Sequence, residues 1–134
     1  MDPKARMPLW MMIEVFVGTA IPAILSVTAA PYLVAMLFIS PFWAVQSGRP
    51  EDLFWVVFSL SYLGGGMAVC VIWREAILLT PSRLPVILGL PGGVMATWAV
   101  TVGLGPEFGA LVALPTWFVA LHLLWWKARH FRPV

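Results

Sequence analysis

Two ionisable residues, Glu14 and His122, lie inside long apolar segments, where charged groups are rare and often mark a path for protons or cations. Glu14 follows Trp10 by one helical turn and would lie about 6 Å deeper than that ring in a membrane helix. His122 precedes the basic tail at Lys127 by a similar distance. If both segments meet the same side of a membrane, the two side chains can form a proton relay or a structural hydrogen bond.

Other patterns that indicate catalysis or cofactor binding are missing from the sequence. It contains no P-loop, nucleophile elbow, HExxH helix, catalytic carboxylate pair or cysteine–histidine set. The single cysteine, Cys70, allows neither an internal disulfide nor a CxxC metal site. We therefore expect no enzymatic activity, no cofactor and no bound metal.

The composition is that of a chain whose solvent is lipid. Of the 134 residues, 61% are hydrophobic and 10% are charged, whereas about a quarter of the residues in a soluble domain carry charge. The eight Lys and Arg residues lie at the ends of apolar runs and form no patch, which argues against a nucleic-acid partner. We expect a single all-α transmembrane domain over residues 1–134, with the lipid bilayer as its surroundings.

Three runs predict ordinary membrane-spanning helices: residues 53–73, 84–105 and 108–126. Each is about 20 residues long, enough to cross about 30 Å of hydrocarbon. The first region, residues 7–45, is long enough for two crossings, but Pro31 and Pro41 interrupt its second half. We expect one span over about 7–27 and a re-entrant or interfacial segment, or a short span, over 31–45.

The distribution of basic residues favours four crossings over five. With four crossings, Arg49 stands alone on one side and the other basic residues share the opposite side: Lys4, Arg6, Arg74, Arg83, Lys127, Arg129 and Arg132. With five crossings, Arg49 joins Lys4 and Arg6, so the asymmetry is weaker. The positive-inside rule then places both termini in the cytoplasm, and we expect a bacterial inner membrane. Five transmembrane helices are the alternative, because five ordinary helices satisfy every backbone hydrogen bond without a special element.

Tryptophans mark the ends of the apolar runs, as in the aromatic belts of membrane proteins. We expect these rings to anchor the chain at the membrane interfaces: Trp10, Trp43, Trp55, Trp73, Trp125 and Trp126.

Glycines and a proline inside the runs indicate either close helix packing or local helix breaks. The residues are Gly64, Gly65, Gly66, Gly89, Pro91, Gly92 and Gly93. Small residues let two helix backbones approach closely, and Gly89 and Gly93 form a GxxxG pair. Unwound backbone near the middle of a membrane can instead line a substrate or ion site.

The stretch from Glu14 to Gly18-Thr19 resembles the first helix of the small multidrug resistance transporters, which carries a glutamate just ahead of a Gly-Thr-like pair. Trp98, followed by Gly103 and Gly105, is similar to a tryptophan helix of that family. The resemblance covers a small part of the chain, and residues 31–52 have no counterpart in it. It implies a proton-coupled transporter that uses Glu14.

Three functions follow as hypotheses. The first is a non-enzymatic membrane component that works through helix contacts, as an accessory subunit of a larger complex or as a homo-oligomer. The second is a small proton- or cation-coupled transporter or channel that uses Glu14, with His122 as its partner. The third is a membrane toxin or an immunity protein, which the size allows.

Overall fold

In the computed structural model, which describes residues 7–78 and 83–130, every regular element is helical. A long helix, α1 (Leu9–Ser47), is followed by a 3-10 turn, η1 (Pro50–Leu53), and by α2 (Phe54–Ile77). A π-helical turn, η2 (Pro85–Gly89), leads into α3 (Leu90–Leu104), and α4 (Pro106–His130) completes the fold. The expected all-α class is confirmed, and among the described residues four helices are long and apolar enough to cross a membrane.

The first helix differs from the expectation. Residues 31–45, expected as a separate re-entrant or interfacial segment or a short span, are part of the same helix as residues 9–30, because α1 runs without a break through Pro22, Pro31 and Pro41. A proline removes one backbone N–H and crowds the preceding turn, which bends a helix but breaks it only when the freed carbonyl stays unsatisfied. The prolines in α1 therefore do not divide it.

The structure shows how one of these prolines is tolerated. Pro22 has no N–H to donate to the carbonyl of Gly18, four residues earlier in the helix. The hydroxyl of Thr116 on α4 lies 3.2 Å from that carbonyl and 3.0 Å from the Val112 carbonyl of its own helix, so its one proton is shared between the two. A side chain of α4 thus supplies part of the hydrogen bonding that the first helix lacks.

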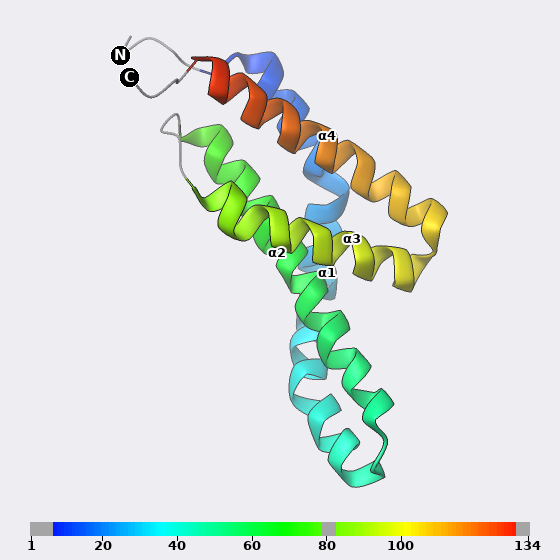
Figure 1. Cartoon of the computed structure of the whole chain (residues 1–134). Helices are drawn as coiled ribbons and strands as arrows, with labels where there is room; N and C mark the ends of the chain where they lie inside the picture. The colour runs from blue at the N-terminus through cyan, green and yellow to red at the C-terminus, as the bar shows by residue number, and fades with distance from the viewer. Residues whose placement is uncertain (1–6, 79–82, 131–134) are drawn as a thin grey trace.

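The helices pair as two hairpins of unequal length (Figure 1). In Figure 1, α3 and α4 diverge from their turn at Gly105 and pack across one half of the α1–α2 hairpin. Residues 31–57 form the far half of the α1–α2 hairpin, which we call the arm, and its α2 side touches α3 where the rings of Phe54 and Trp98 lie 6.1 Å apart. The described ends of α1 and α4 lie together at the opposite end of the molecule.

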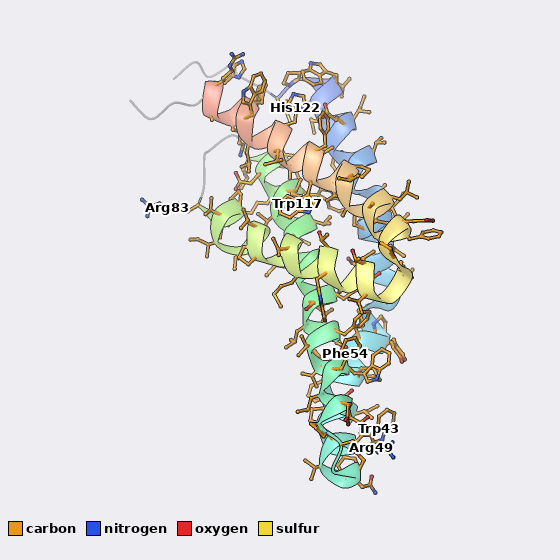
Figure 2. The ribbon with its side chains drawn as sticks, turned by 45° about the vertical axis from the view of Figure 1, so that its right-hand side comes forward. Trp43, Arg49, Phe54, Arg83, Trp117 and His122 are labelled. Atoms are coloured by element: carbon orange, nitrogen blue, oxygen red, sulfur yellow. The ribbon has the colours of Figure 1, made fainter. Side chains whose placement is uncertain are left out.

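The described basic residues are divided unequally between the two ends of the molecule. Arg49 lies at the tip of the arm (Figure 2), where α1 turns into η1. The other end of the molecule carries Arg74, Arg83, Lys127 and Arg129, at or near the ends of α2, α3 and α4. Lys4, Arg6 and Arg132, which the charge count also used, lie outside the described residues.

Glycines permit close contacts between α2 and α3. A Cβ added at Gly92 would overlap the carbonyl oxygen of Gly64, and one added at Gly65 would lie 2.5 Å from the Ala96 Cβ. Such distances require backbones in direct contact. The two helices therefore meet through a seam of small residues.

The remaining glycines of these segments face other neighbours. The Gly89 and Gly93 pair does not form one seam, since a Cβ at Gly89 would meet Val71 of α2 and one at Gly93 would meet the Trp117 ring of α4. Gly66 faces Ser26 of α1. Pro91 lies in the first turn of α3, directly after the π-helical turn, so close packing and a local irregularity occur together here.

The core lies near the basic end and is built from α1, α2 and α4. Its buried members include Met11, Val15, Ala76 and Leu123. Trp126, expected as an interface anchor, is a member of this core and is only 8% exposed. It is buried because the face of α4 that carries it packs on α1 and α2. Four of the expected anchors do lie on the outer surface: Trp10, Trp43, Trp55 and Trp125.

Candidate functional site

Glu14 and His122, far apart in the sequence, are in contact between α1 and α4. Nδ1 of His122 lies 2.7 Å from Oε1 of Glu14, a hydrogen-bond distance. When Glu14 is ionised, a proton on Nδ1 is donated to it, and a protonated imidazole makes the contact an ion pair. The two groups can therefore share or exchange a proton.

Aromatic rings surround this pair. The imidazole of His122, labelled in Figure 2, lies within 6 Å of three rings, with centroid distances of 5.8 Å to Trp10 and 5.9 Å to both Phe118 and Trp125. All three rings are themselves exposed. The side chains of Glu14 and His122 keep 26% and 27% of their surface exposed. The pair thus opens to the outer surface of the α1–α4 groove rather than to the centre of the bundle.

A second polar cluster, between α2 and α4, is buried far more deeply. Nζ of Lys127 lies 2.6 Å from Oε2 of Glu75 and donates a second hydrogen bond to the carbonyl of Leu78, at 2.8 Å. Arg74 lies 3.3 Å from the other carboxylate oxygen of Glu75. The side chains of Glu75 and Lys127 are only 2% and 5% exposed, so each charge depends on the other.

Sequence reasoning missed this cluster. Glu75 stands next to Arg74 at the end of an apolar run, and Lys127 opens the basic tail, so the local sequence indicates ordinary interface charges at both positions. A signal was present in the helical period. Trp126, Leu123 and Val119 form one apolar stripe of α4, and Lys127, four residues after Leu123, lies on that same inward face.

Neutral hydrogen bonds connect further helix pairs. The indole N–H of Trp73 donates to the hydroxyl of Thr19 at 2.6 Å, and that hydroxyl donates to the Val15 carbonyl at 2.7 Å. Trp73, expected at an interface, therefore connects α2 to α1 by a hydrogen bond. The indole N–H of Trp117 donates to Thr97 at 3.0 Å and connects α4 to α3.

An apolar cleft of about 140 Å³ lies between α3 and α4, with α2 and part of α1 as its floor. Trp117, which lies between α3 and α4 in Figure 2, and Gly93 line its middle. Glu75 lines its end toward the basic side of the molecule. Glu14 and His122 are not among its lining residues, so the polar pair and the cleft are separate features.

The arm exposes apolar side chains around both of its helices. Phe38 is 77% exposed and Phe42 is 66% exposed, while only Leu33, Met36 and Ser40 of α1 are buried there. The other exposed large apolar residues of the arm are Tyr32, Val34, Ile39, Trp43, Val45, Leu53, Phe54, Trp55 and Val57.

No family model, curated protein or solved structure matches this chain. Within residues 7–78 and 83–130, no three His, Cys, Asp or Glu side chains come close enough to hold a metal ion.

Proposed function

We propose that this chain is a non-enzymatic membrane subunit whose arm binds other helices in the membrane. The first partner of the arm is a second copy of the same chain. The observation that carries the proposal is the length of the apolar arm. The four-helix part would then hold the subunit in the bilayer.

Helix lengths support this assignment. The 20 residues of η2 and α3 span about 30 Å, the thickness of the hydrocarbon layer. The 39 residues of α1 span about 58 Å. Even at a tilt of about 40°, near the upper limit for membrane helices, α1 would extend about 45 Å along the membrane normal. Tilting alone does not keep all of α1 within the hydrocarbon layer, so part of the arm reaches the headgroup regions.

The surface of the arm requires a cover. Its exposed rings and aliphatic side chains would meet headgroups or water wherever the arm leaves the hydrocarbon. Large contiguous apolar surfaces in contact with water mark sites of protein association. Contact with another apolar helix pair would remove this surface from water.

The tip of the arm favours a second copy as that partner. Arg49 and Glu51 are both exposed there, whereas Asp52 already accepts a hydrogen bond from Ser47 at 2.7 Å. In a two-fold arrangement, Arg49 of each copy can meet Glu51 of the other, since such an interface pairs each patch with itself. The charges at the tip are therefore self-complementary.

Disulfide cross-linking in native membranes tests this proposal. In a Cys70→Ser background, single cysteines are placed on the arm at Phe38, Phe42 and Val45, and on α4 at the equally exposed Leu111 and Leu114 as controls. We expect mild oxidation to give a covalent dimer from at least one arm position and from neither control. The same set of cross-linked species from arm and control cysteines, or no covalent dimer at all, would refute the self-association.

A second candidate function is a proton-coupled transporter, favoured by the 2.7 Å contact between Glu14 and His122. A carboxylate beside an imidazole can pass a proton between two states of the bundle. The apolar cleft is lined by neither residue, which places this candidate second. If Glu14→Gln leaves proton-coupled flux in proteoliposomes unchanged, the transporter hypothesis is lost.

A further inference from the structure

We infer that the cleft between α3 and α4 binds one acyl chain of an anionic phospholipid, whose headgroup lies at the basic end of the cleft near Arg83. This site is separate from the arm and goes beyond the proposed function. It does not depend on self-association.

The cleft has the size and lining for a hydrocarbon segment. Its volume of about 140 Å³ is close to the ~150 Å³ of a cavity that stays dry and holds a benzene ring, so it can hold a segment of an acyl chain and not the whole chain. Trp117, Val100 and Ile72 are typical of its walls. Most of its lining is apolar, with Glu75, Thr97 and Thr116 among its few polar residues, and such a space favours an apolar occupant.

The cleft is open to the surroundings along its side. Val86 of η2, Leu90 of α3 and Leu121 of α4 line it, and each keeps more than half of its surface exposed. A chain already in the bilayer can therefore enter sideways, without passing through the bundle. In Figure 1, α3 and α4 diverge toward the basic end of the molecule, where Pro85 and Glu75 line the cleft.

Charge selects the headgroup. Pro85, two residues after Arg83, lines the cleft, and Arg83 is itself exposed (Figure 2). Arg74, Lys127 and Arg129 lie at the same end, where Glu75 is the acidic member of the buried cluster. Basic pockets between membrane helices bind anionic headgroups. The excess of positive charge favours an anionic lipid over a zwitterionic one.

The test compares bound lipid on the intact chain, reconstituted in nanodiscs that contain equal amounts of phosphatidylglycerol and phosphatidylcholine and then released for native mass spectrometry. We expect one retained phospholipid per chain, with phosphatidylglycerol enriched several-fold. Ala120→Phe, which adds a ring to the cleft wall, should abolish the adduct. Ala110→Phe, on the exposed surface of α4 and outside the cleft, should keep it.

Two further variants keep the inference testable if the added ring prevents folding. Ala120→Leu makes a smaller change and should lower the retained lipid at least twofold. Arg83→Gln leaves the cleft wall intact and should remove the preference for phosphatidylglycerol, whereas Arg49→Gln, at the tip of the arm, should not. Equal adducts in Ala120→Leu and Ala110→Phe, or an unchanged preference in Arg83→Gln, would overturn the inference. The inference would also be overturned if the cleft variants lost the mass of a second chain and kept the mass of the bound lipid.

Discussion

The ammonium group of Lys127 and the carboxylate of Glu75 form an ion pair at 2.6 Å with almost no exposed surface, and the Leu78 carbonyl accepts a further hydrogen bond from the same ammonium group. This pair connects the end of α2 to the end of α4. Because a buried charge is tolerated only when it is paired, the two helices cannot separate here without exposing both charges. The pair therefore fixes how the two hairpins meet.

Removal of one partner should destabilise the fold strongly. We expect Lys127→Met or Glu75→Gln alone to cost about 3–5 kcal/mol, because each leaves a buried charge or polar group with part of its partners gone. The double variant should cost less than the sum of the two single ones. The free energy of unfolding of each variant in a mild detergent, monitored by circular dichroism, measures these differences. Arg129→Met serves as an exposed control, and equal losses in control and core variants would contradict the prediction.

The Glu14–His122 pair should contribute much less to stability. Each side chain keeps about a quarter of its surface exposed, and exposed ion pairs contribute about 1 kcal/mol or less. A double-mutant cycle with Glu14→Gln and His122→Gln should give a coupling free energy within that limit. A coupling of several kcal/mol would show instead that this pair, like the Glu75–Lys127 pair, holds the fold together.

Two glycines of the same seam should respond differently to alanine. At Gly92 the added methyl group would overlap the Gly64 carbonyl, which belongs to the backbone and cannot move aside, so we expect a loss of about 1–3 kcal/mol. At Gly64 the added methyl would lie 3.5 Å from its nearest neighbour, an ordinary contact, so the loss should be small. Thermal unfolding of the two variants measures both losses of stability. A larger loss for Gly64→Ala than for Gly92→Ala would contradict the close backbone contact at this seam.

The hydrogen bond from Thr116 to the Gly18 carbonyl provides a test of how α1 tolerates Pro22. We expect Thr116→Val to cost about 0.6 kcal/mol, the average for side-chain hydrogen bonds between membrane helices. In a Pro22→Ala background the helix regains its own N–H donor for that carbonyl, so the same substitution should cost less. Equal costs in both backgrounds would show that Thr116 does not replace the missing bond.

Composition and the length of the charge-free runs were enough to predict α2, α3 and α4. Long apolar runs without charge predicted an all-α chain, and the ends of the last two helices follow the predicted runs closely. The depth argument on Trp10 and Lys127 allowed Glu14 and His122 to meet, which they do. Both expectations rest on local pattern and on chain direction, which a sequence contains.

Contacts between helices that are distant in the sequence were not predictable in the same way. The prolines in α1 suggested a break, but the donor that satisfies the Gly18 carbonyl comes from Thr116, 98 residues later. Trp126 and Lys127 were placed at an interface because they adjoin a basic tail, although their face of α4 is packed against the core. Where a helix face points depends on its neighbours, and these are not determined by local sequence.

The central claim, that the arm is covered by a second copy of the chain, is tested most directly by the native mass of the protein extracted in a mild detergent. We expect a species of at least twice the 14.8 kDa chain mass. The double variant Phe38→Ala and Phe42→Ala should shift it toward a single chain, whereas Phe108→Ala and Leu111→Ala on the exposed face of α4 should not. A single copy with a different protein would contradict self-association, and a strictly monomeric chain without any partner would contradict the proposed function as a whole.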